Sequence, residues 1–205
     1  MNGFQAAWQA IASETEAMCG DLARMLACDT SFPPGDTYPA FAALLEELVA
    51  PLALPTRRVL VPQALWQGGA AAGARVNLIA GAPQGRPVCS LYFHVDTVPP
   101  GDGWTHPPLA LTRADARLYG RGAADMKGSI AAVLAALRAA RRHGVELAFD
   151  PVLLFCTDEE GGLYPGIRYL AEQKLVEGHL LSFNGGAAPR IWAGCLVRLD
   201  LLATF

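Results

Sequence analysis

The sequence predicts an α/β fold, a three-layer α/β/α sandwich in which helices cover both faces of a central β-sheet. Short apolar segments alternate along the chain with longer segments whose apolar residues recur at helical spacing. One of the short segments, Pro151–Thr157, is a continuous apolar run, which is typical of a strand buried on both faces. Acidic residues follow it directly, and sites in such folds collect at the carboxyl ends of strands.

The first part of the chain predicts two helices separated by a turn. Over Phe4–Leu26, five apolar residues are spaced to share one helical face: Trp8, Ile11, Met18, Leu22 and Leu26. The stretch Thr30–Asp36 contains two prolines and a glycine and therefore predicts a turn. A second helix is expected over Pro39–Ala50, closed by Pro51.

The middle of the chain predicts strands and then a third helix. The expected strands are Arg58–Pro62, Val76–Ala80 and Val88–His94. Glycine and alanine crowd together over 68–74, which indicates an exposed loop. The segment Ser129–His143 is rich in alanine and leucine, and Gly144 follows it as a helix stop.

The tail predicts a strand over Leu180–Phe183, a loop, and an alternating run from Ile191 to Phe205. Because the sequence ends inside a strand pattern, we expect a fragment of a longer protein. Unpaired strand edges in such a chain would favour association.

Composition excludes several classes of protein. A chain of 205 residues that is 52% hydrophobic and 17% charged is a well-buried globular protein and not a disordered one. The net charge is −3 and the basic residues are dispersed, so we expect no nucleic-acid partner. No apolar run approaches the ~18 residues of a membrane span, and the N-terminus lacks signal-peptide order. Five cysteines without a CxxC pair favour the cytoplasm.

Three polar clusters at element boundaries carry the candidate chemistry. His94 and Asp96 end a strand, and in an alternating strand positions i and i+2 point the same way. The Asp96 carboxylate could then accept the second ring N–H of His94 and orient the imidazole for a metal. Asp125 lies in a glycine-bounded loop before a helix, where a carboxylate could bridge two cations. Glu159 and Glu160 are adjacent, so they point differently and can take different roles.

Metal-assisted amide hydrolysis needs two kinds of group, and these clusters could supply both. Ligands hold a cation that acidifies water, and one free carboxylate accepts the proton. Zinc suits histidine and carboxylate ligands, although cobalt and manganese accept them too. A histidine at a strand end is more often structural, and an acidic pair is more often solvated surface. The three clusters together favour the metal site over those interpretations.

The stretches FHVDTVPPGDGWTHPP, LYGRGAADMKGSIAA and LLFCTDEEGG resemble the signatures of a zinc metallopeptidase and amidohydrolase family. That family includes acetylornithine deacetylase, succinyl-diaminopimelate desuccinylase, aminoacylase and glutamate carboxypeptidase. The resemblance implies two zinc ions, held by His94 and Glu160 and bridged by Asp125. It implies Glu159 as general base and Asp96 as the residue that orients His94. It also implies that residues 1–189 are the N-terminal part of the catalytic domain and that residues 190–205 begin a lid domain that mediates dimerisation. The substrates it implies are N-acyl amino acids or small peptides, and the assembly it implies is a homodimer.

The chain departs from the family pattern in two places. Where the family supplies a further carboxylate ligand, this sequence has SFNGGAAP, and Asn184 is the nearest match. A late histidine ligand has no counterpart before Phe205. His106, in the segment GWTHPP, is interpreted as a substrate-side or structural residue.

Two functions follow from these observations. The first is a hydrolase, an enzyme that cleaves the amide bond of an N-acyl amino acid or small peptide. The alternative is a non-catalytic homologue that acts as a binding protein, which Asn184 and the incomplete ligand set favour. A structural domain with coincidental acidic loops would require three independent coincidences and ranks last.

Overall fold

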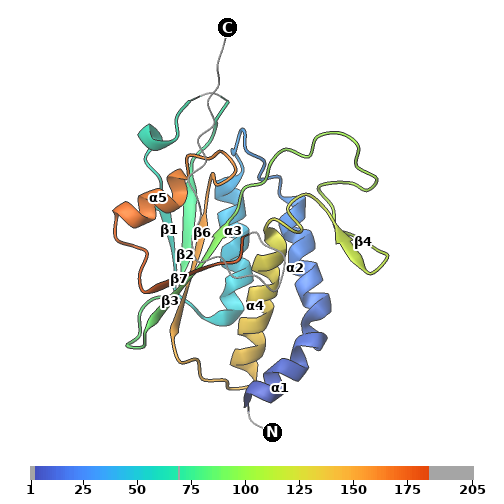
Figure 1. Cartoon of the computed structure of the whole chain (residues 1–205), viewed down its shortest axis with the longest axis vertical. Helices are drawn as coiled ribbons and strands as arrows, with labels where there is room; N and C mark the ends of the chain where they lie inside the picture. The colour runs from blue at the N-terminus through green and yellow to red at the C-terminus, as the bar shows by residue number, and fades with distance from the viewer. Residues whose placement is uncertain (1–2, 69, 185–205) are drawn as a thin grey trace.

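The structure is a computed structural model that describes residues 3–68 and 70–184 (Figure 1). Its α-helices are α1 (Gly3–Ala10), α2 (Thr15–Ala27), α3 (Tyr38–Val49), α4 (Lys127–Arg142) and α5 (Pro165–Glu172). Short 3-10 helices occupy Ile11–Glu14, Ala50–Leu52 and Gln63–Leu65. The strands are β1 (Thr56–Leu60), β2 (Val76–Ala80), β3 (Val88–His94), β4 (Thr112–Ala114), β5 (Arg117–Tyr119), β6 (Asp150–Cys156) and β7 (His179–Ser182).

Five of these strands form one mixed sheet in the order β1-β2-β6-β3-β7. β3 runs parallel to β6 and to β7, whereas β2 is antiparallel to β6 and to β1. β6 lies in the middle, and Val152–Cys156 are buried, as its continuous apolar run predicts. Since β3 and β6 are parallel, His94 pairs with Cys156 and the two carboxyl ends lie at the same edge.

Helices cover both faces of the sheet, which confirms the predicted α/β sandwich (Figure 1). On one face, apolar residues of α2, α3 and α4 form the larger core, which contains Phe41, Ile130 and Phe155. On the other face, Leu170 of α5 packs on Leu154 and its neighbours in a smaller core. The strands whose ends carry the candidate site residues are therefore covered by helices on both faces.

The prediction of one continuous helix over Phe4–Leu26 is wrong, because two α-helices occupy this segment. The Ile11–Glu14 segment is a 3-10 helix that separates α1 from α2, and the hydroxyl of Thr15 donates to the carbonyl of Ala12 there. A 3-10 turn holds about three residues in place of 3.6, so the apolar face shifts around the axis. Leu22 and Leu26 are buried as expected, but Trp8 is 69% exposed.

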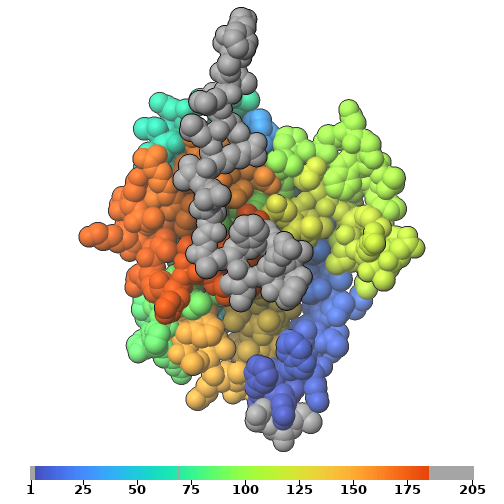
Figure 2. All heavy atoms as spheres, in the orientation of Figure 1, coloured from blue at the N-terminus to red at the C-terminus, as the bar shows by residue number. Residues whose placement is uncertain are grey.

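The sequence did not predict the β4–β5 hairpin, which lies in the long connection between β3 and α4. That connection projects on the side of the molecule away from α5 (Figures 1 and 2).

Two predictions fall outside the described residues, namely the loop and strand after Asn184 and the proposed division at 189/190. No helix in the described ranges is long and apolar enough to cross a membrane.

Candidate metal centre

His94 ends β3 with its side chain fully buried. Its Nδ1 lies 3.0 Å from the backbone carbonyl oxygen of Asp96, whereas the nearer carboxylate oxygen of Asp96 is 3.6 Å away. The carbonyl is therefore the nearer acceptor for the ring N–H, and the carboxylate forms a longer ion pair with the same nitrogen. The chain leaves the strand after His94, so the alternation that would align the two side chains no longer applies.

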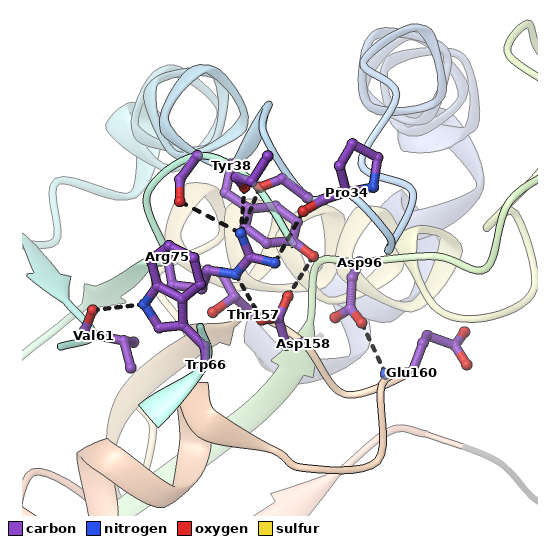
Figure 3. A network of polar contacts seen from close by, with 12 residues as sticks. Pro34, Tyr38, Val61, Trp66, Arg75, Asp96, Thr157, Asp158 and Glu160 are labelled. Atoms are coloured by element: carbon purple, nitrogen blue, oxygen red, sulfur yellow. Dashed lines mark hydrogen bonds and ion pairs between the residues drawn. The ribbon is translucent and has the colours of Figure 1, made fainter. Parts of the chain in front are cut away.

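The carboxylate of Asp96 instead reaches the neighbouring strand end. Its Oδ2 accepts the backbone N–H of Glu160 at 2.8 Å, as Figure 3 shows. Its Oδ1 is buried and has no hydrogen-bond partner among the described residues. Asp96 thus links the two strand ends, and its Oδ1 lies on the Nδ1 side of the His94 ring.

Asp125 reaches His94 from the loop before α4. Its Oδ1 lies 2.8 Å from Nε2 of His94, and its side chain is 59% exposed. Two residues later, the buried Lys127 donates from Nζ to the carbonyls of Met25 and Cys28, each at 3.0 Å. These carbonyls belong to the end of α2, so Lys127 fastens the Asp125 loop to that helix.

Glu159 and Glu160 occupy the turn after β6. Ligand atoms of His94, Glu159 and Glu160 all lie within 4.8 Å of one another, close enough to hold one cation. Asp125 is joined to the group through Nε2 of His94. The structure therefore brings together the residues that the sequence singled out, although their individual roles stay predictions.

Burial and crowding shift the protonation of these groups. Burial is the largest influence on the pKa of His94 and lowers it, but the carboxylates of Asp96, Asp125 and Glu159 raise it to about 9. Burial raises the pKa of Glu159 and of Glu160, and neighbouring carboxylates add to this, while His94 acts in the opposite direction. One imidazole facing several carboxylates leaves an excess of negative charge, which a divalent cation would balance.

Two further residues were candidates in the sequence. The side-chain amide of Asn184 donates to Oε1 of Glu159 at 3.1 Å, so Asn184 does lie at the site. His106 packs against the ring of Tyr119, with ring centroids 4.7 Å apart, in the connection between β3 and α4. That contact fits the structural interpretation of His106.

Sequence reasoning missed a buried polar group behind the two glutamates. Arg75 pairs with Asp158, and Tyr38 donates its hydroxyl to the same carboxylate (Figure 3). An arginine preceding a strand and an aspartate beside two glutamates each look like surface residues in a sequence. Their separation of 83 positions leaves no local pattern that would pair them.

The sequence also matches a family of known enzymes. The model of peptidase family M20/M25/M40 matches residues 90–195, which include all the candidate ligands. Succinyl-diaminopimelate desuccinylase of Acidiphilium cryptum is 42% identical over 108 residues, or 52% of this chain. The enzyme of that name from Xylella fastidiosa is 46% identical over 105 residues, or 49% of this chain. The matches span only 28% and 27% of those proteins' lengths.

Solved structures share the fold. Human carnosine dipeptidase 1 superposes with a TM-score of 0.72 at 22% identity, over 88% of this chain and 41% of that one. The di-peptidase Dug1p from Saccharomyces cerevisiae gives a TM-score of 0.73 at 17% identity, over 90% of this chain and 42% of its own. The resemblance read from the three signature stretches is confirmed, and so is the fold that it implied.

Proposed function

Because this chain belongs to peptidase family M20/M25/M40, we propose that it carries the catalytic centre of a metal-dependent hydrolase that cleaves amide bonds. The observation that supports this most directly is the group formed by His94, Glu159 and Glu160, whose ligand atoms lie within 4.8 Å. Asp125 contacts the same imidazole. Three parts of the chain far apart in sequence thus meet around the imidazole of His94.

His94, Asp125 and Glu160 would hold the cations, with zinc as the expected metal and two ions as the expected number. A cation bound there would lower the pKa of a water molecule and polarise the scissile carbonyl. The donor set fits such a group, since it consists of an imidazole and carboxylates, and the buried carboxylate of Asp96 adds negative charge beside His94. Cobalt and manganese fit the same ligands.

Glu159 would be the general base. It is half-buried, and burial raises its pKa above the ordinary value, which brings a carboxylate closer to the proton affinity that base catalysis needs. It would take the proton from the attacking water and return it to the leaving amine. The amide of Asn184 would hold Oε1 of Glu159, leaving the second oxygen free for that transfer.

The substrate that we propose is an N-acyl amino acid, and the acyl group that we consider first is succinyl. Relatives at 42% and 46% identity bear the name succinyl-diaminopimelate desuccinylase. Small peptides come second, because the dipeptidases share only the fold. The proposal includes a homodimer and a cytoplasmic location.

Asn184 is the observation that favours the second candidate, a homologue that binds without turnover. A neutral amide is a weaker zinc ligand than a carboxylate, so one of two metal positions would have a lower affinity.

Metal content and hydrolysis test the proposal together. The purified protein should retain about two zinc ions per chain by elemental analysis and should release amine from N-succinyl-diaminopimelate. A chelator should abolish the release, and zinc should restore it. Glu159→Gln should keep the zinc and lose the turnover. Retained zinc without turnover on any N-acyl amino acid or dipeptide would favour the non-catalytic homologue, and folded protein that holds no zinc would refute the hydrolase.

A further inference from the structure

We propose that Arg75 is a positioning residue that, through its buried ion pair with Asp158, sets the direction of the turn that presents Glu159 and Glu160. The inference rests on the proposed function for the roles of the two glutamates. It concerns the Arg75 cluster, which we define as Arg75, Asp158, Tyr38 and Trp66. Figure 3 shows these four side chains gathered together, with Glu160 to one side of Asp158.

The turn depends on an unusual backbone conformation at Asp158. This residue has a φ of 58°, in the left-handed region, and it stands between the end of β6 and Glu159. Residues other than glycine seldom adopt this conformation, although aspartate and asparagine tolerate it best. A strained residue persists only where its surroundings hold it, and such residues cluster at functional sites. The direction in which the chain leaves β6 therefore depends on what holds Asp158.

Both oxygens of the Asp158 carboxylate are held. Oδ2 accepts from Nε of Arg75 at 2.7 Å, and Oδ1 accepts from the hydroxyl of Tyr38, also at 2.7 Å. The carboxylate is buried, with a side-chain exposure of 4%. Burial raises the pKa of Asp158, whereas the bonds from Tyr38 and Arg75 lower it. The side chain has one position in which both contacts are made.

Arg75 is itself immobilised. Its side chain is fully buried, and its terminal nitrogens donate to the backbone carbonyls of Pro34, at 3.0 Å, and of Ala72. Its guanidinium carbon lies 4.3 Å from the ring centroid of Trp66, and Trp66 in turn donates its indole N–H to the carbonyl of Val61. An arginine with a stacked plane and carbonyl partners presents Nε in one direction.

The carbonyl partners of Arg75 connect it to the other half of the site. Pro34 lies in the loop in which the amide of Phe32 donates to the carbonyl of Thr97, the residue after Asp96. The ring of Phe32 packs against Gly161, where an added Cβ would lie 2.3 Å from the ring. The same loop thus touches both strand ends, and Arg75 joins it to Asp158.

A buried ion pair between Arg75 and Asp158 fixes the orientation of the two side chains more than it stabilises the fold. The desolvation cost of two buried charges offsets most of their attraction, so apolar side chains often serve stability equally well. A paired carboxylate and guanidinium nevertheless keep two residues in a defined relative orientation. Residues behind metal ligands act in this way, and their loss commonly weakens metal binding about 10–100-fold.

Hydrogen exchange at the amide of Glu160 tests the inference in metal-free protein. That amide donates to Asp96 at 2.8 Å only while the turn keeps its direction. Asp158→Asn removes the charge but retains a residue that tolerates the left-handed conformation. Exchange at Glu160 should accelerate about tenfold or more, while the amide of Leu154 in β6 stays unchanged. A purely stabilising role would accelerate both amides together.

Asp21→Asn is the matched control. Asp21 pairs with Arg138, and the two side chains are 15% and 12% exposed, so the same chemical change removes another largely buried ion pair. This variant should leave exchange at Glu160 unchanged. Arg75→Met is a second test of the same pair and should accelerate exchange at Glu160 as Asp158→Asn does.

Zinc affinity in the same variants separates the two proposals. If the unaltered protein binds no zinc while Asp158→Asn still accelerates exchange at Glu160, the proposed function fails and the positioning role holds. If zinc binds equally well to the unaltered protein and to Asp158→Asn, and exchange at Glu160 is unchanged, the positioning role is overturned and the proposed function remains.

Discussion

The carboxylate of Asp96 accepts the backbone N–H of Glu160 at 2.8 Å, across 64 positions of sequence. One residue follows the end of β3, and the other lies in the turn after β6. The bond couples the two strand ends, so a shift of either one moves a candidate ligand.

We predict that Asp96→Ala weakens zinc binding about 10–100-fold, which is the usual effect of losing a residue behind a metal ligand. Asp96→Asn should weaken it less, because its amide oxygen can still accept the N–H of Glu160. Titration of zinc against a competing chelator measures both affinities. Equal affinities for the two variants would show that the hydrogen bond to Glu160 does not matter.

The two adjacent glutamates should separate into two roles. Glu159→Gln should lower the turnover number by about 10²–10⁴-fold, the contribution of a general base, and keep the metal. Glu160→Gln should lose metal first, since an amide is a poor zinc ligand. Steady-state rates and elemental analysis of both variants provide the measurement. The reverse pattern would exchange the assigned roles.

Zinc should stabilise the folded protein. At a free concentration one hundred times the dissociation constant, a ligand that binds only the folded state contributes about 2.7 kcal/mol. For a chain of 205 residues, this raises the midpoint of thermal unfolding by about 5–10 °C.

His94→Ala is the control for that measurement and should abolish the shift, because it removes the imidazole from the candidate ligand group. A shift of the same size in His94→Ala would place the zinc elsewhere in the protein.

Two glycines should respond to alanine with opposite signs. Gly81 has a φ of 108°, and a Cβ there would lie 2.3 Å from the carbonyl oxygen of Pro151, so Gly81→Ala should destabilise by more than about 1 kcal/mol. Gly20 is an exposed residue of α2 with open space around its missing Cβ. Gly20→Ala should therefore stabilise by about 0.5–1 kcal/mol. Urea denaturation measures both, and a stabilising Gly81→Ala would contradict the geometry.

Local patterns in the sequence predicted most elements of the sheet and its helices. The bounds of β2 and β3 agree with the predicted Val76–Ala80 and Val88–His94, because short apolar runs bounded by turn residues are typical of strands. The helix expected over Ser129–His143 is α4, which begins two residues earlier, at Lys127. Strand ends also indicated the site, since the polar residues there interrupt apolar runs.

The sequence by itself determined which residues could carry the chemistry, because histidine and carboxylates at the ends of buried strands stand out locally. Only the tertiary structure decided how they are held. It directed the Asp96 carboxylate to Glu160, gave the ring of His94 a backbone carbonyl partner, and placed Arg75 against Asp158. These contacts join segments up to 83 positions apart. They lie where the sheet and its covering helices exclude water, and no periodicity of the chain encodes them.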